Sequence, residues 1–279
     1  MPSQFHYFIH LNMQSSEDTS LQPILYSCYF SKSREGEQFI PEHIISYQIS
    51  GSFYMHDGQQ SQTFEAGEMR FCHRNRLAKF LKQPPADGEF KSISIYFDQE
   101  LLRQISLEYG YKAEKRGDAA AFSGLRPDPL LKSYFESLAP YEQGGQLIPE
   151  QLKELKLREG VLILLQTHPE LKDVLFDFAE PGKIDLEGFM QQNFHFNVEL
   201  KRFAYLTGRS LATFKRDFEK IFALSPSRWL LQRRLQEAHY RIQEQGETPS
   251  DVYLELGFED LSHFSFAFKK RYGVAPSQL

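Results

Sequence analysis

Residues 257–277 read GFEDLSHFSFAFKKRYGVAPS, and this stretch decides the fold of the C-terminal part of the chain. Its outline occurs once before, 50 residues earlier. The paired positions are Ser210 and Asp260, Phe214 and Phe264, Phe218 and Phe268, Lys220 and Lys270, Phe222 and Tyr272, Pro226 and Pro276, and Ser227 and Ser277. In each copy a helix-capping side chain comes first, aromatic residues follow at every fourth position, and a proline closes the segment. The spacing predicts two copies of one amphipathic helical unit, each with a buried aromatic face.

Each unit ends a pair of predicted helices. The pairs are 198–206 with 211–222 and 249–256 with 261–271, and further helices are expected at 185–193 and 226–244. The residues expected to cap the starts of these helices are Asn197, Ser210, Ser225, Thr248 and Asp260. Each pair is joined by a turn that contains a glycine, Gly208 or Gly257, because a side chain there is expected to collide where the helices cross. This spacing favours a helix-turn-helix, although an ordinary helical bundle also uses glycine turns and aromatic stripes.

The same residues resemble the AraC/XylS family of transcription regulators. The second unit is similar to the family pattern G-F-x-D-x-S-x-F-S-R-x-F-K-K-x-x-G-x-x-P-S at nearly every fixed place. The first unit shares Gly208, Ser210, Phe214, Arg216, Phe218 and Ser225-Pro226, followed by Arg233-Arg234-Leu235 and Ala238. The resemblance covers about 100 residues, and the region before them is similar in outline to the cupin-like β-barrel sensor and helical linker of many family members.

The resemblance implies two recognition helices that enter successive major grooves of double-stranded DNA, about 34 Å apart. The candidate DNA-binding residues are Arg209, Ser210, Ala212, Thr213, Lys215 and Arg216 in the first unit, and Leu261, Ser262, His263, Ser265, Phe266, Lys269 and Lys270 in the second. Arg216 is the strongest candidate for reading a base, because a guanidinium can contact guanine O6 and N7 together. Lys269, Lys270 and Arg209 are expected to contact phosphates.

Two positions depart from the family pattern. Ala223 stands where a glycine usually ends the first recognition helix, which removes a favourable helix stop. Phe266 stands where an arginine is expected, and an aromatic ring cannot donate hydrogen bonds to a base. Phe266 can contact a thymine methyl group, pack internally, or belong to a unit that holds only the DNA backbone.

Composition limits the class of protein. The chain has 279 residues and a net charge of −5. From residue 182 onward it contains 14 Lys and Arg and 12 Asp and Glu, so the C-terminal part is less acidic than the rest but not strongly basic. Cys28 and Cys72 form no metal-binding or disulfide motif, and we expect buried free thiols. The sequence has neither a signal peptide nor an apolar segment of membrane-spanning length, so a cytoplasmic protein without a membrane partner is expected.

The N-terminal part has the texture of short antiparallel strands. From about Leu21 to Phe97, strand-like runs alternate with turns at Asp57-Gly58 and 65–68, which favours a small β-barrel or sandwich. Asp98 and Gly110 delimit a helix, a second helix follows from 127–129 to about Leu138, and a third spans 149–166. We expect Leu152, Leu155, Val161, Leu162 and Leu165 to form the apolar face of this third helix, which can dimerise the protein or pack on its own barrel.

The predicted fold class is therefore α+β. Residues 1–110 are expected to form the cupin-like barrel, 111–180 a helical linker with a possible role in dimerisation, and 181–279 the all-α double helix-turn-helix. The barrel is expected to sense an unknown small-molecule effector, with a pocket guessed at Ile44, Tyr47, Phe53, Phe71 and Ile95. No cofactor is expected, and RNA polymerase is a further partner if the protein activates transcription.

The competing hypothesis is a cupin-type metal-dependent enzyme. His43, His56 and His73 lie in the predicted barrel, and barrels of this shape can hold a metal with histidines and a carboxylate. The three histidines are isolated, however, and no His-x-His pair with a following Glu occurs. Glu68 and Arg70, beside the second turn, are equally well interpreted as solvated side chains. The sequence therefore favours no metal and no catalytic residue.

Overall fold

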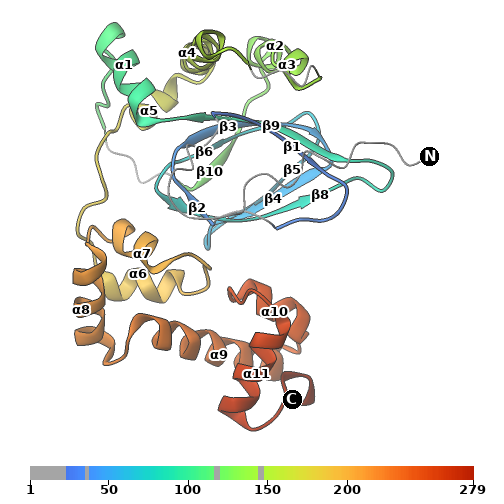
Figure 1. Cartoon of the computed structure of the whole chain (residues 1–279), viewed down its shortest axis with the longest axis vertical. Coiled ribbons are helices and arrows are strands. Elements are labelled where there is room, and N and C mark those ends of the chain that lie inside the picture. The colour runs from blue at the N-terminus through green and yellow to red at the C-terminus, as the bar shows by residue number, and fades with distance from the viewer. Residues whose placement is uncertain (1–22, 35–37, 116–119, 144–147) are drawn as a thin grey trace.

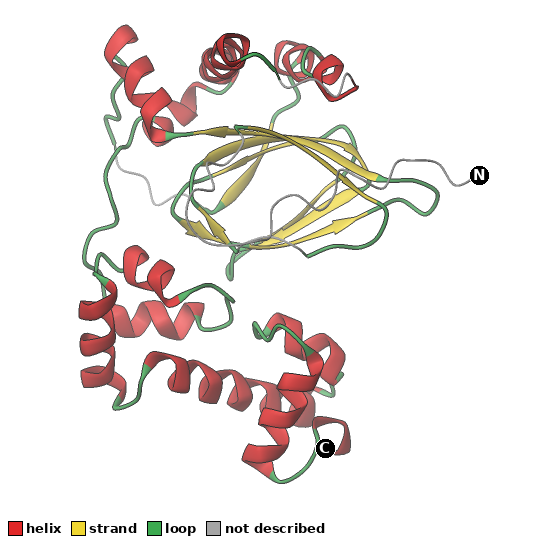
Figure 2. Cartoon of the chain, viewed as in Figure 1, coloured by secondary structure: helices red, strands yellow, loops and turns green. Residues whose placement is uncertain are grey.

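The computed structural model describes residues 23–34, 38–115, 120–143 and 148–279 of the chain. It has an N-terminal half of strands covered by helices and a C-terminal half made of helices alone (Figure 1). Figure 2 shows the strands confined to the N-terminal half, between the helices that cover them and the helical domain. Leu21, where the sequence predicts the first strand region to begin, lies outside the described residues. An α+β architecture with a helical C-terminal domain is confirmed.

The strands form three antiparallel sheets. The strands are β1 (Ile24–Tyr29), β2 (Phe39–Ile40), β3 (His43–Ser50), β4 (Ser52–His56), β5 (Ser61–Phe64), β6 (Met69–Cys72), β7 (Arg76–Leu77), β8 (Lys79–Gln83), β9 (Phe90–Phe97) and β10 (Phe122–Leu125). The orders are β1-β9-β3-β6-β10, β5-β4-β8 and β2-β7. The turn at 57–60 joins β4 to β5 as predicted, and Gly58 has the positive φ of 94° that such a turn favours.

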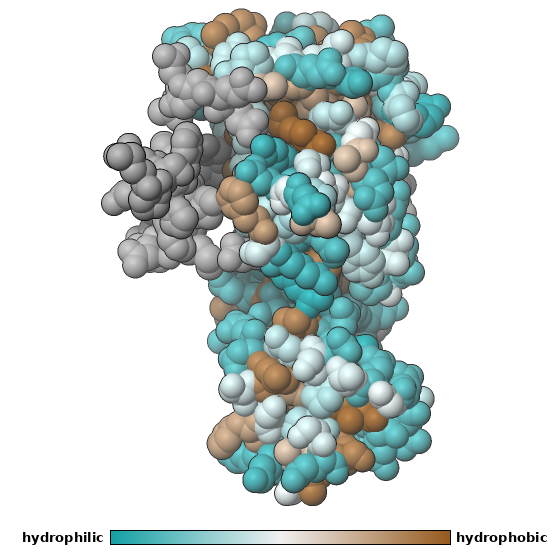
Figure 3. All heavy atoms as spheres, turned by 90° about the vertical axis from the view of Figure 1, so that its right-hand side faces the viewer, coloured by the Kyte–Doolittle hydropathy of each residue, from teal (hydrophilic) through white to brown (hydrophobic). Residues whose placement is uncertain are grey.

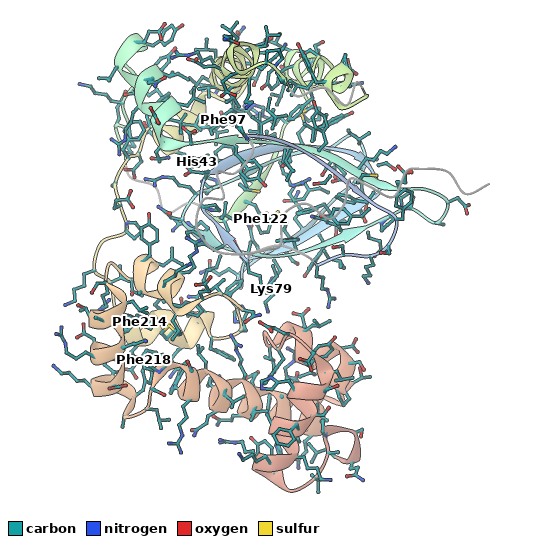
Figure 4. The ribbon with its side chains drawn as sticks, viewed as in Figure 1. His43, Lys79, Phe97, Phe122, Phe214 and Phe218 are labelled. Carbon is teal, nitrogen blue, oxygen red and sulfur yellow. The ribbon has the colours of Figure 1, made fainter. Side chains whose placement is uncertain are left out.

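The five-stranded sheet is buried on both faces. One face packs on helices α1 (Gln99–Tyr109), α2 (Pro129–Glu136) and α4 (Glu150–Thr167), and Phe97 lies in this layer (Figure 4). The other face shares an apolar cluster with the three-stranded sheet, and Phe122 lies between the two sheets (Figure 4). The remaining elements of this half are α3 (Ala139–Gln143), η1 (Pro169–Leu171) and α5 (Lys172–Leu175). Since side chains alternate along a strand, neighbouring residues of β3, β6 and β9 enter different cores.

The segment expected to form the linker contains a strand as well as helices. Strand β10 lies beyond residue 110 and pairs with β6, so the five-stranded sheet extends into that segment.

Helix α4 has the predicted bounds to within a residue, and its predicted apolar side chains divide between two environments. Val161 is buried in the core between the sheet and its covering helices, whereas Leu152 and Leu155 are 42% and 62% exposed. Gly160, which the sequence did not mark, is also buried, because it packs closely on Tyr134, whose hydroxyl oxygen would lie 2.5 Å from any Cβ there.

The C-terminal helices match the predicted ranges closely. They are α6 (Leu186–Asn193), α7 (Leu200–Leu206), α8 (Leu211–Phe222), α9 (Pro226–Gln245), α10 (Pro249–Glu255), α11 (Leu261–Tyr272) and the short η2 (Pro276–Gln278). Ser210, Thr248 and Asp260 accept hydrogen bonds from backbone N–H groups in the first turn, as predicted. Asn197 does not cap α7, whose N-cap is Glu199; the Asn197 backbone N–H donates to Gln38 Oε1 at 2.9 Å.

The two halves share part of a core. Phe39 of β2 and Leu77 of β7 belong to the same buried cluster as the helices of the C-terminal domain. The Arg202 guanidinium lies 4.5 Å from the Phe39 ring centre. Lys79, which points from β8 toward the helical domain (Figure 4), donates to the main-chain oxygen of Glu255. The strand-rich half therefore contacts both the first and the second helical unit.

Candidate nucleic-acid interface

Helix α8 has one buried and one exposed face. Phe214 and Phe218 are fully buried and point into the helical domain (Figure 4), where Phe218 meets Trp229 of α9 with ring centres 5.5 Å apart. Of the sequence-predicted residues on the other side, Ala212, Lys215 and Arg216 are exposed and Thr213 is half-buried. Ser210 is also exposed, but its hydroxyl oxygen already caps the helix through the Thr213 N–H. Burial of the aromatic stripe thus orients the predicted DNA face outward.

Two arginines near α8 have different surroundings. The Arg216 side chain is 64% exposed, and its Nε lies 3.6 Å from Asp217 Oδ1, which makes a weak surface ion pair. The Arg209 side chain is only 7% exposed. It forms an ion pair with Asp217 at 3.3 Å and donates to the main-chain oxygens of Ile184 and Thr207. Arg209 therefore holds the turn of the first unit, and its predicted role as a phosphate contact is corrected.

Helix α11 repeats this arrangement. Asp260 Oδ1 accepts from the His263 N–H at 2.6 Å, and Phe264 and Phe268 are fully buried. The outward residues are Leu261, Ser262 and His263, which are exposed, Ser265, which is half-buried, and Phe266, which is 70% exposed. The exposure of Phe266 excludes internal packing, one of the three interpretations that the sequence left open.

Cations gather at the C-terminal end of α11. Lys269, Lys270 and Arg271 occupy the last turn and are exposed. There they complement the partial negative charge of the helix end, and they also offer positive charge to a phosphate backbone. Figure 3 shows a face of the molecule on which apolar side chains of the lower half reach the surface in small patches among hydrophilic ones.

The glycines of the two turns are required for a reason other than the predicted collision of crossing helices. Both have positive φ, 64° at Gly208 and 79° at Gly257. A Cβ at Gly208 would lie 2.3 Å from the main-chain carbon of Gly182, in the segment that enters the domain. A Cβ at Gly257 would lie 2.7 Å from the main-chain oxygen of His195. The obstacles are thus connecting segments that pass beside the turns.

Helices α8 and α11 end in the same backbone conformation with different residues. Ala223 follows α8 with φ 54°, and Gly273 follows α11 with φ 82°. The N–H of each donates to a main-chain oxygen four residues earlier, that of Glu219 or Lys269. A left-handed conformation suits glycine and strains alanine. The departure seen in the sequence therefore leaves the helix end in place and adds local strain.

Arg234 of α9 connects the two units, a role that sequence reasoning missed. Its Nε and Nη2 donate to the main-chain oxygens of Phe194 and Phe196, just before the first unit, at 2.8 Å each. Its Nη1 donates to the oxygen of Gly257, in the turn of the second unit, also at 2.8 Å. Burial lowers the pKa of Arg234 to about 10, which leaves it charged at neutral pH. The resemblance had marked Arg234 only as part of a motif, without a function.

The guessed pocket residues lie on two sides of the five-stranded sheet. Ile44 and Phe53 join the cluster between the sheets. Tyr47, Phe71 and Ile95 pack instead against the covering helices, so for these three the guess is wrong. The cause is strand register: Ile45, not Ile44, pairs with Phe71 and Ile95, and residues that pair directly share a face.

The space between the sheets is more polar than the sequence indicated. Ser46, Gln48, Arg70 and Ser92 are all at most 3% exposed, and β3, β6 and β9 bring them to one face through the pairs Ser46 with Arg70 and Gln48 with Ser92. Arg70, interpreted from sequence as a side chain that could equally be solvated, is therefore buried. The neighbouring Glu68 is exposed in its turn, as that interpretation allowed.

The histidines of the enzyme hypothesis do not form a metal site. His43 and His73 are buried with ring centres 6.4 Å apart, whereas His56 lies beside His195 of the helical domain. Burial lowers the pKa of His73 to about 4, so the ring is neutral at physiological pH. Within residues 23–34, 38–115, 120–143 and 148–279, no group of three or more His, Cys, Asp or Glu side chains could hold a metal ion. Cys28 and Cys72 are free thiols, and only Cys72 is fully buried.

Sequence comparison relates both halves of the chain to families of regulatory proteins. The family described as a helix-turn-helix domain matches residues 203–279, and the ExsA N-terminal regulatory domain matches residues 43–174. The thermoregulatory protein LcrF of Yersinia pestis is 25% identical over 256 residues, which cover 88% of this chain and 89% of LcrF. The HTH-type transcriptional regulator ExsA of Pseudomonas aeruginosa is 29% identical over 133 residues, or 47% of this chain and 48% of ExsA.

A solved structure aligns along most of the chain. A crystal structure of an apo variant of ToxT from Vibrio cholerae covers 92% of this chain and 97% of its own, with 12% identity and a TM-score of 0.46. Separately, none of the helices formed by the described residues is both long enough and apolar enough to cross a membrane.

Proposed function

The chain is a DNA-binding transcription regulator of the AraC/XylS type, and we propose that it holds double-stranded DNA with two recognition helices, α8 and α11. The observation that carries this proposal is the repeated arrangement of the two helices. Each is capped at its first turn, buries two phenylalanines, and turns its remaining side chains to solvent. Arg234 ties the two units together, so that one fixed spacing is presented to successive major grooves.

The proposed contacts differ between the two helices. In α8 we propose that Arg216 reads a guanine, with Ala212, Thr213 and Lys215 beside it and Ser210 at the helix start. In α11 the proposed contacts are Leu261, Ser262, His263, Ser265 and Phe266, with Lys269 and Lys270 on phosphates. Phe266 offers the DNA an apolar surface, which favours a thymine methyl group or backbone contact over a guanine.

For the N-terminal half we propose a cupin-like sensor of a small-molecule effector. The domain limits proposed from sequence, 1–110, 111–180 and 181–279, are kept with one addition: β10 of the linker completes the sensor's sheet. The polar residues buried between the sheets, Arg70 among them, support a ligand-binding role, because a purely structural core gains little from them. The enzyme alternative lacks a comparable cluster among the described side chains.

Three further parts of the proposal concern partners and location. We place the protein in the cytoplasm, where the DNA it regulates is found. If it activates transcription, as the name of the VirF relative from Yersinia enterocolitica says of that protein, RNA polymerase is a partner. Homodimerisation through α4 is supported by the exposed Leu155, which lies with Tyr109 of α1 along a surface hollow. Sedimentation of the Leu155→Asp variant tests this proposal, because loss of the dimer should lower the mass in solution. A mass equal to that of the unaltered protein would show that α4 does not form a dimer interface.

The DNA proposal is tested by selecting bound fragments from a random DNA pool and measuring affinity for the selected site. Arg216→Ala should weaken binding to that site by roughly 1–3 kcal/mol and bind random DNA almost as well as the unaltered protein. Lys220→Ala, on the same helix, is the matched control for a general loss of charge. An equal loss on both DNAs would reduce Arg216 to a phosphate contact, and failure to select any site would contradict the proposed function.

A further inference from the structure

The segment 194–197, which leads from α6 into the first helical unit, is held by the strand-rich half of the protein. The Asn197 N–H donates to Oε1 of Gln38, next to β2, at 2.9 Å. The ammonium group of Lys79, on β8, lies 5.5 Å from the centre of the Phe196 ring, which is within the range of a cation–π contact. Two side chains of the strand-rich half therefore fix the start of the first unit.

Lys79 also reaches the second helical unit. Its half-buried side chain points from β8 toward the helical domain (Figure 4), and its ammonium group donates to the main-chain oxygen of Glu255. Glu255 is the last residue of α10, so it lies directly before the turn that contains Gly257. One side chain of the strand-rich half thus contacts the entrance of the first unit and the turn of the second.

Arg234 of α9 joins the same two places from within the helical domain. Its guanidinium donates to the main-chain oxygens of Phe196 and Gly257, both at 2.8 Å. Lys79 and Arg234 therefore cross one gap from two sides. Because the acceptors are main-chain oxygens, both contacts depend directly on where the backbone of each unit lies.

The surroundings of Lys79 are unfavourable for a cation. Burial lowers its pKa to about 8; Glu255 raises the pKa, whereas Arg234, Arg241 and Arg34 lower it further. An ammonium group is strongly hydrated, so a lysine removed from water among other cations adds little to the free energy of folding. What the contact supplies is a defined position of the second unit rather than stability.

That position matters for a protein that contacts DNA with two helices. One base pair between two half-sites moves the second by about 3.4 Å along the duplex and about 34° around it. A second unit attached through Arg234 alone can pivot about that side chain. An additional attachment on the side of the strand-rich half removes this freedom, so that only one spacing fits.

We propose that Lys79 is a positioning residue for DNA recognition, which fixes the second helical unit relative to the first and so sets the half-site spacing that the protein accepts. The inference rests on the proposed use of α8 and α11 as recognition helices. It gives the strand-rich half a part in the choice of DNA sites without any contact between that half and DNA.

The test uses the full chain and the DNA site selected from a random pool, with two altered sites in which one base pair is inserted or removed between the half-sites. The unaltered protein should bind the altered sites at least about tenfold more weakly than the selected one. Lys79→Met should bind them within about threefold of the selected site, because its second unit can pivot. On a duplex that carries only the first half-site, Lys79→Met and the unaltered protein should bind equally.

Two further variants serve as controls. Lys79→Arg keeps a cation that can contact both the oxygen and the ring, so it should retain the spacing preference. Lys82→Met is the matched control on the same strand, because the Lys82 ammonium donates to the Tyr29 hydroxyl within the strand-rich half. It should bind all the duplexes as the unaltered protein does.

Three results would overturn the inference. These are an unchanged spacing preference in Lys79→Met, equal weakening of that variant on every duplex including the single half-site, and no spacing preference in the unaltered protein. If Lys79→Met does not fold, as judged by circular dichroism, Lys79→Gln is tested by the same criteria. A chain that folds with neither substitution needs Lys79 for stability, which also contradicts the inference. If the unaltered protein binds no selected site at all, the proposed DNA-binding function fails, whereas normal binding with one spacing preference in every variant removes only the role of Lys79.

Discussion

Exchanging the residues that end the two proposed recognition helices, α8 and α11, should change stability in opposite directions. Ala223 and Gly273 occupy equivalent positions of the two units, and both have positive φ. A residue with a Cβ in this conformation costs about 1–2 kcal/mol, whereas glycine loses about 0.5–1 kcal/mol more backbone entropy on folding. The difference favours glycine, so Ala223→Gly should stabilise the protein by about 0.5–1 kcal/mol. Gly273→Ala should destabilise it by a similar amount.

The structure makes this a clean comparison. Within the described part of the chain, no atom beyond the two sequence neighbours lies within 4 Å of a Cβ built at Gly273, so the substitution adds backbone strain without a steric collision. The chain has one tryptophan, Trp229, whose ring centre lies 4.6 Å from that of Phe222, next to Ala223. Its fluorescence therefore reports on the first unit during urea unfolding, and circular dichroism follows the helices of both units.

A shift of the urea midpoint to higher concentration in Ala223→Gly, with an unchanged slope, is the expected result. In heat, the same change should appear as a rise of about 2–4 °C for each kcal/mol gained. Combining Ala223→Gly with Gly273→Ala should restore the original stability, because separated sites add. If Ala223→Gly is neutral or destabilising while Gly273→Ala is harmless, the backbone strain ascribed to Ala223 is wrong.

Three further predictions concern Arg234, which joins the two helical units, Phe266 of α11, and the dependence of stability on pH. Arg234→Met should lower the free energy of unfolding by about 3–5 kcal/mol and weaken DNA binding, because three main-chain oxygens lose a buried charged donor. The neighbouring Arg233→Met, which removes a partly exposed ion pair, should lower it by only about 1 kcal/mol. Equal losses in urea unfolding would contradict the role of Arg234 in joining the two units. Phe266→Arg should leave the melting temperature nearly unchanged, because the side chain is exposed, and should steepen the salt dependence of DNA binding by a slope of up to about one. Early melting with loss of all binding would contradict the placement of Phe266 on a DNA-binding face. Acidification from about pH 6.5 toward 4 should destabilise the fold, because His73 binds a proton in the unfolded chain while the buried ring stays neutral in the folded one. His73→Gln should therefore reduce the slope of unfolding free energy against pH, by up to about 1.4 kcal/mol per pH unit. An unchanged slope would refute the lowered pKa of His73.

The sequence predicted the helical domain well because its signals are local. Capping side chains and aromatic residues at every fourth position gave α8 its observed limits and α11 to within one residue. The outward placement of Lys215 and Arg216 follows from the burial of Phe214 and Phe218. Arg234 could not be predicted in the same way, since its partners are main-chain oxygens up to 40 residues away.

The pocket was harder to predict because it depends on long-range strand register. A shift of one residue sends every side chain of a strand to the opposite face, and Ile44 and Ile45 are indistinguishable in sequence. The pairing of β3 with β6 and β9 decides which of the two enters the space between the sheets. A similar reason explains Arg70, because a charged residue beside a turn gives no sign of its burial before the opposite sheet is placed. Helix α4 was predicted in extent, but the burial of Gly160 was not, because it depends on close packing against Tyr134 of another helix.

The contribution of Phe39 and Leu77 to the core of the helical domain limits how far this regulator can be divided into parts. A fragment that starts at residue 181 would leave both side chains behind, with burial worth about 1.5–3 kcal/mol for each of them. A chimera that joins this helical domain to a foreign sensor would need to replace the β2–β7 strand pair with an equally apolar surface. Recombination between related regulators would therefore succeed more often when that strand pair travels with the DNA-binding half, even though the two are separated by about 100 residues of sequence.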